Sequence, residues 1–210
     1  RRMLIGIDFD NTIAGYDRLF ARLAVELGLL DAAPAGGKRA VRDAIRAQNS
    51  EGDIAWQRLQ AVAYGRRMIE AEMIAGVAEF FGACRRQGVP VRIVSHKTRH
   101  AAYDPDQVDL RLAAINWMQS KGFFDAAGFG LAPGQVFFEA TRQDKVQRIG
   151  ELGCTHFIDD LEEVFAEPEF PNGVRAILFD PNGSETTRRV NCTALAAWDE
   201  ITEYVLGARH

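Results

Sequence analysis

Five short apolar runs, separated by segments with helical periodicity, constrain the fold of this 210-residue chain more than any other feature. The runs are Leu4–Phe9, Val89–Ser95, Val136–Phe138, Thr155–Ile158 and Val174–Phe179. Short apolar runs bounded by turn residues are typical of buried strands, and repeats of three and four residues are typical of helices. Strands that alternate with helices form βαβ units, so we predict an α/β protein with a doubly wound parallel sheet and a Rossmann-like core.

One stretch departs from this alternation, because residues 16–72 contain helical patterns and no clear strand. A leucine stripe beginning at Leu19 marks the first of these helices. A crossover between parallel strands normally uses one helix. We therefore predict two domains, a catalytic core of residues 1–15 and 73–210 and a helical cap of residues 16–72. The alternative is a longer crossover whose helices pack flat on the sheet.

Composition narrows the class of protein. Hydrophobic residues make up 47% and charged residues 26%, as in ordinary globular proteins, and the net charge of −4 does not favour nucleic-acid binding. No apolar stretch approaches the ~18 residues of a membrane span, and the N-terminal run is interrupted too early for a secretory signal. The three cysteines are far apart, which argues against a disulfide framework or a thiolate zinc site. We expect a cytoplasmic protein without nucleic-acid or membrane partners; its oligomeric state stays open.

Carboxyl, hydroxyl and amino groups gather where the predicted strands end. In open parallel sheets, ligands bind outside the carboxyl ends of the strands, so these groups are expected to converge on one site. The candidates are Asp8, Asp10 and Thr12 after the first strand, Ser95 at the end of the second, Lys145 at the start of a helix, and Asp159 and Asp160 after the fourth.

The four aspartates, Asp8, Asp10, Asp159 and Asp160, form a set of oxygen donors only. Two carboxylates about 4 Å apart repel each other by about 4 kcal/mol at an effective dielectric constant near 20, so something must offset their charge. Oxygen ligands with room for water suit Mg²⁺. A hydroxyl and an ammonium group nearby, from Ser95 and Lys145, suit an anionic oxygen group such as a phosphoryl group.

The same residues resemble the four motifs of the haloacid dehalogenase-like (HAD) superfamily. The motifs appear in order as "DFDNT", "VRIVS", Lys145 and "FIDD". The segment "IAGVAEFFGACRRQGVPVRIVS" also resembles the lead into the second motif of members with a helical cap after the first strand. The resemblance covers about Met3–Phe179 and implies a phosphatase-type hydrolase with such a cap.

The resemblance also implies a role for each residue. Asp8 resembles the nucleophile that forms an aspartyl phosphate, and Asp10 resembles the general acid and base. Dehalogenases of the family lack an acid at the position of Asp10, so Asp10 indicates a phosphatase or a phosphomutase. Thr12, Ser95 and Lys145 would hold the nucleophile and the phosphoryl oxygens.

The implied metal ligands are the Asp8 carboxylate, the Asp10 backbone carbonyl and the late acid pair. We expect Asp160 to bind Mg²⁺ directly and Asp159 to act from a second position or through water. A long polar loop, "SHKTRHAAYDPDQVD", follows the second motif, and its Lys97 is an alternative to Lys145 as the phosphate-binding lysine.

We therefore expect a Mg²⁺-dependent phosphatase that acts on a small phosphorylated metabolite through an aspartyl phosphate. A phosphomutase of the same superfamily is the neighbouring alternative. A receiver-like signalling module is a different class with a similar doubly wound fold and an Asp, Ser/Thr and Lys set. Receivers have about 120 residues and no helical insertion, which makes them a poorer match to this chain.

Overall fold

The computed structural model describes residues 2–183 and 190–207 of the chain. Contacts between residues divide it into two compact units, each described by itself below. The core unit consists of Arg1–Ile13, Met73–Lys97 and Gly122–His210, and the helical unit consists of Ala14–Glu72 and Thr98–Lys121. None of the helices in the described ranges combines the length and the apolar character that a membrane span requires.

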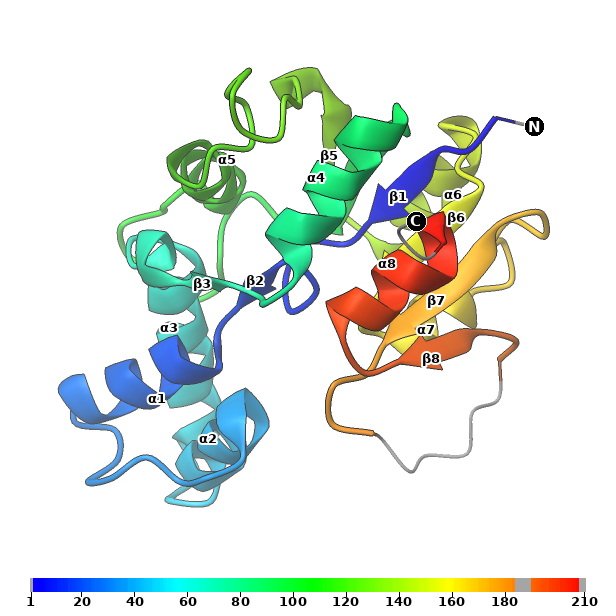
Figure 1. Cartoon of the computed structure of the whole chain (residues 1–210). Helices are drawn as coiled ribbons and strands as arrows, with labels where there is room; N and C mark the ends of the chain where they lie inside the picture. The colour runs from blue at the N-terminus through cyan, green and yellow to red at the C-terminus, as the bar shows by residue number, and fades with distance from the viewer. Residues whose placement is uncertain (1, 184–189, 208–210) are drawn as a thin grey trace. The chain divides into compact units, whose positions relative to one another are not determined.

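The core unit is built on a six-stranded sheet with the order β5-β4-β1-β6-β7-β8 (Figure 1). Every neighbouring pair in it is parallel, which confirms the predicted doubly wound sheet. The strands are β1 (Ile5–Ile7), β4 (Val91–His96), β5 (Val136–Glu139), β6 (His156–Asp159), β7 (Arg175–Phe179) and β8 (Thr193–Leu195).

Five of these strands lie where the apolar runs predict them, and every end agrees within two residues. The sixth, β8, was not predicted from the sequence. Its three residues are half-buried, and three residues are too few to show an alternating or continuous apolar pattern. Its place at the edge of the sheet is set by pairing with β7, in the register Phe179↔Leu195.

Helices cover both faces of this sheet. On one face α4 and α8 pack together, with the rings of Phe80 and Trp198 5.0 Å apart, and Figure 1 shows the two helices side by side. On the other face, α6 and α7 share a hydrophobic cluster with Val94, Phe157 and Leu178 of the strands. The helices of the core unit are α4 (Val77–Gln87), α6 (Arg142–Glu151), α7 (Glu162–Phe165), α8 (Trp198–Leu206) and the 3-10 helix η2 (Pro133–Gln135).

The chain enters the helical unit after β1, which confirms the predicted helical insertion. Its interior is aromatic, with the rings of Phe20 and Trp56 4.9 Å apart and those of Tyr16 and Tyr64 4.7 Å apart. The elements are β2 (Ala14–Gly15), α1 (Asp17–Glu26), α2 (Gly37–Arg46), α3 (Gly52–Tyr64), η1 (Met68–Glu70), β3 (Glu72–Met73), whose Met73 falls in the core unit, and α5 (Leu110–Ser120).

Thr98–Lys121, which includes α5, packs with the helical unit. The indole Nε1 of Trp117 in α5 donates a buried hydrogen bond of 2.8 Å to the Ala71 carbonyl oxygen beside η1. The sequence pattern instead predicts this segment within a core of residues 1–15 and 73–210, a range whose residues 1, 184–189 and 208–210 lie outside the described chain. The assignment of catalysis to one part and a cap function to the other stays a prediction.

Candidate active site

The central strands bring Asp8 and Asp159 together. Ile7 of β1 is in register with Ile158 of β6, so the next residues, Asp8 and Asp159, are neighbours at the carboxyl ends of adjacent strands. The Asp8 N–H donates to the Ile158 carbonyl oxygen at 2.9 Å, which continues the pairing beyond β1. Because side chains alternate along a strand, Asp8 and Asp159 share the face that carries Val94 and Phe157, the face covered by α6.

Lys145 reaches these two carboxylates from α6. Its Nζ lies 2.7 Å from Asp8 Oδ1 and 2.6 Å from Asp159 Oδ2, and its side chain is 2% exposed. Thr141 caps the N-terminus of this helix, because its hydroxyl oxygen accepts a hydrogen bond from the Asp144 N–H. Burial disfavours the ammonium ion, but the carboxylates of Asp159 and Asp8 outweigh it and raise the pKa of Lys145 above its ordinary value.

The loop after β1 adds Thr12. Its Oγ1 lies 3.0 Å from Asp8 Oδ2 and 3.1 Å from Asp160 Oδ1, so one hydroxyl links the two acid motifs. The loop closes tightly because Asn11 adopts a left-handed conformation with φ of 64°, which Asn tolerates better than most residues. Trp198 Nε1 of α8 donates to the Thr12 carbonyl oxygen at 2.9 Å and holds the loop in place.

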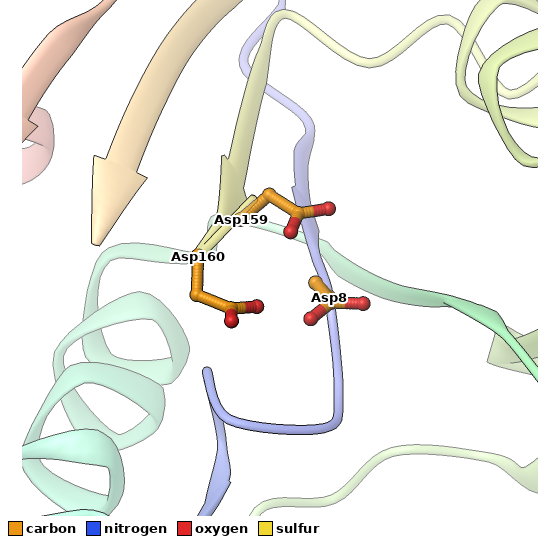
Figure 2. A group of neighbouring side chains, drawn as sticks. All are labelled: Asp8, Asp159 and Asp160. Atoms are coloured by element: carbon orange, nitrogen blue, oxygen red, sulfur yellow. The ribbon is translucent and has the colours of Figure 1, made fainter. Parts of the chain in front are cut away.

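Asp8, Asp159 and Asp160 form a compact cluster of carboxylates, with one ligand oxygen from each within 4.8 Å of the others (Figure 2). Burial and the Asp8 carboxylate raise the pKa of Asp159 to about 6, against the opposing effect of Lys145. Burial, Asp8 and Asp159 also raise the pKa of Asp160 well above its usual value. The carboxylates therefore resist being ionised together unless a cation joins them.

The charges of this cluster fit a divalent cation. Three carboxylates and the single Lys145 ammonium carry three negative charges and one positive charge, which leaves a formal charge of −2. One Mg²⁺ ion would neutralise it, and Mg²⁺ prefers oxygen ligands such as these. The donor set thus fits the metal that the sequence predicts.

Ser95 and Asp10 also lie at the carboxyl ends of the strands, as the three clustered aspartates do. Ser95 is the second-last residue of β4, the strand beside β1, and its exposed fraction is 1%. Its Oγ is buried and has no hydrogen-bond partner among the described residues, which is uncommon for a buried hydroxyl. Asp10 carries a separate ion pair, with its Oδ2 2.8 Å from Lys97 Nζ.

The structure gives different partners to the two lysines that the sequence offered as alternatives for binding phosphate. Lys145 contacts Asp8 and Asp159, whereas Lys97 contacts Asp10. Trp198 was not expected at the site, and no local pattern could have revealed it, because it lies 186 residues from Thr12 along the chain. Asn11 was visible inside "DFDNT", where an Asn before Thr is compatible with a left-handed turn.

Among known proteins, only the solved structures give matches to this chain, and these matches agree on one fold. No protein-family model and no curated protein sequence matches the chain. Among solved structures, the chain is similar to the putative HAD hydrolase YfnB of Bacillus subtilis, bound to magnesium, whose structure reveals interdomain movement. The identity is 13%, the TM-score is 0.62, and the match covers 99% of this chain and 100% of the other.

Two further structures are similar over nearly their full lengths. A HAD family hydrolase of Deinococcus radiodurans R1, with bound phosphate and sodium, has 17% identity, a TM-score of 0.58, and coverage of 97% of this chain and 95% of its own. An L-2-haloacid dehalogenase has 11% identity, a TM-score of 0.57, and coverage of 98% and 99%. The chain therefore has the fold of the HAD hydrolases, with a helical insertion after the first strand of the sheet.

Proposed function

We propose that the protein is a Mg²⁺-dependent phosphatase that hydrolyses a small phosphorylated metabolite through an aspartyl phosphate on Asp8. The observation that carries the proposal is the cluster of Asp8, Asp159 and Asp160 around the single ammonium of Lys145, with its formal charge of −2. The buried hydroxyl of Ser95 lies at the same end of the sheet and has no hydrogen-bond partner in the described ranges, which supports a phosphoryl oxygen as its partner. The bound phosphate of the Deinococcus radiodurans hydrolase agrees with such a substrate.

In this proposal Asp8 is the nucleophile. Lys145 holds one carboxylate oxygen and the Thr12 hydroxyl approaches the other, so the group is fixed before substrate binds. An Asp8 oxygen attacks phosphorus, the bond from phosphorus to the ester oxygen breaks, and Asp10 donates a proton to the leaving oxygen. A water molecule then attacks phosphorus, Asp10 accepts its proton, and the bond to Asp8 breaks to release phosphate.

The metal would be held by the carboxylates of Asp8 and Asp160 and by the backbone carbonyl of Asp10, with Asp159 behind them. When bound, Mg²⁺ would supply positive charge against the negative charge that develops on the phosphoryl oxygens. Lys145 and Ser95 would add an ammonium and a hydroxyl donor toward the same oxygens. Asp10 distinguishes this proposal from dehalogenation, because a carbon–halogen bond releases a halide that needs no proton donor.

The test is phosphate release from p-nitrophenyl phosphate with Mg²⁺, with EDTA and with Ca²⁺. We expect turnover with Mg²⁺, none with EDTA, and none with Ca²⁺, which prefers more ligands and looser geometry. Asp8→Asn should abolish turnover, whereas Asp125→Asn, at an exposed aspartate of the core unit, should retain it. Full activity in EDTA, or release of chloride from a 2-haloacid without any phosphate release from the ester, would reject the proposal.

A further inference from the structure

Lys97 is buried although it follows directly after β4. Its N–H donates to the Glu139 carbonyl oxygen at 2.9 Å, so pairing with β5 continues one residue past the strand. Side chains two apart share one face of a sheet, so Lys97 lies on the face of Ser95, while His96 between them is exposed. The main chain therefore directs the Lys97 ammonium toward the end of the sheet.

The ammonium pairs with the Asp10 carboxylate. Lys97 Nζ lies 2.8 Å from Asp10 Oδ2, and the exposed fraction is 4% for the Lys97 side chain and 21% for the Asp10 side chain. The same Nζ lies 5.9 Å from the centre of the Phe9 ring. A lysine stem is long enough to carry its charge out to water, and burying that charge without a counter-charge is unfavourable. The pair with Asp10 therefore holds both side chains in place.

We propose that Lys97 is a positioning residue that orients the Asp10 carboxyl group for proton transfer. The inference rests on the proposed function, in which Asp10 protonates the leaving oxygen. A general acid must lie within about 2.6–3.2 Å of the atom that it protonates, and a carboxyl group on a loop can rotate away from that position. Lys97 holds one of the two Asp10 oxygens from the buried side. Lys97 thus acts through Asp10, whereas Lys145 is bound to Asp8 and Asp159.

The test compares Lys97→Met with wild type on phenyl phosphate and p-nitrophenyl phosphate in Mg²⁺. The two esters differ by a nitro group, which makes nitrophenol the better leaving group and reduces its need for an acid. A general acid contributes about 10²–10⁴-fold, and we expect Lys97→Met to lose about 10–10²-fold in kcat for phenyl phosphate and less than about 3-fold for p-nitrophenyl phosphate. In an Asp10→Asn background, Lys97→Met should cause no further loss, because residues that act as a unit are not additive.

The controls separate positioning from other roles. Arg175→Met removes an exposed cation at the amino end of β7, whereas the site lies at the carboxyl ends of the strands. This variant should behave as wild type. Equal losses of kcat on both esters, or losses that add to those of Asp10→Asn, would mean that Lys97 binds the phosphoryl group directly, which overturns the proposal. The double variant removes both charges, so it leaves no unpaired carboxylate if the single variant folds poorly.

Crystal structures provide a readout that does not depend on activity. Wild type should show the Asp10 carboxyl group beside Lys97 Nζ, and Lys97→Met should show it displaced or in several conformers. An unchanged Asp10 in Lys97→Met would overturn the proposal. If wild type hydrolyses neither ester, the proposed function fails, and these structures alone decide whether Lys97 positions Asp10.

Discussion

At the scale of the residue, Asp159 has an environment very different from water. It is fully buried, and burial and the Asp8 carboxylate raise its pKa from 3.8 to about 6. At a pH between these two pKa values, Asp159 keeps its proton in the folded chain but has released it in the unfolded chain. The proton that Asp159 keeps therefore stabilises the folded chain fully below about pH 4. This contribution to the free energy of unfolding is roughly 3 kcal/mol, at about 1.4 kcal/mol per pKa unit, and it is lost as the pH rises through about 6.

From this we predict that Mg²⁺ stabilises the protein more at about pH 7 than at about pH 5, because a metal ion binds the ionised carboxylates and displaces their protons. The measurement is the Tm in saturating Mg²⁺ and in EDTA at each pH, with ionic strength matched by NaCl. A Tm increase that is the same at both pH values would contradict the raised pKa of Asp159 or its place beside the metal.

At the scale of the element, the central strand β1 depends on a glycine. A Cβ on Gly6 would lie 2.5 Å from Phe157 Cδ2 and 2.9 Å from Phe157 Cε2, closer than carbon atoms approach one another. Phe157 cannot retreat easily, because it is part of the buried cluster under α6 and α7. The small residue lets β1 lie between β4 and β6 with Asp8 at its end.

We expect Gly6→Ala to lower the free energy of unfolding by about 1–3 kcal/mol, the usual cost of overpacking a core. Gly134→Ala is the matched control, since a Cβ there meets no described atom within 4 Å, and its effect should stay within about 0.5 kcal/mol. Urea unfolding of both variants provides the measurement. Equal midpoints for Gly6→Ala and wild type would show that the ring of Phe157 adjusts freely.

At the scale of the whole molecule, two buried tryptophans make the same kind of bond in different units. Trp117 donates to the Ala71 carbonyl in the helical unit, and Trp198 donates to the Thr12 carbonyl in the core unit. Loss of either donor leaves a buried carbonyl without that partner, at about 1–3 kcal/mol. If each unit is a cooperative unit of its own, the loss should loosen only the unit that contains it.

The prediction is that Trp117→Phe increases amide hydrogen exchange in α3, η1 and α5, whereas Trp198→Phe increases it around β1 and α8. Hydrogen-exchange mass spectrometry of the two variants measures this. A rise across both units in either variant would show that the chain unfolds as one cooperative unit. The result also tests whether the segment with α5 behaves as part of the helical unit.

Much of the core could be predicted from the sequence because the signals are local. Apolar runs located five of the six strands of the large sheet, and Gly88 ended α4 with a φ of 66°, as a helix-terminating glycine does. Polar residues at strand ends identified Asp8, Ser95 and Asp159 because parallel strands end at one edge of the sheet. The helix α2 was not predicted separately, since its buried apolar residues are only Val41 and Ile45.

The sequence by itself determined the parallel sheet, the helical insertion and the residue types at the site, because hydrophobic period and strand-end chemistry can be read over a few neighbouring residues. Only the tertiary structure decided which groups pair. Lys145 meets Asp8 across 137 residues, and Lys97 meets Asp10 instead. Such pairings depend on strand order, register and the face that each side chain takes, and these are set by packing between distant segments, which leaves no mark in the local pattern.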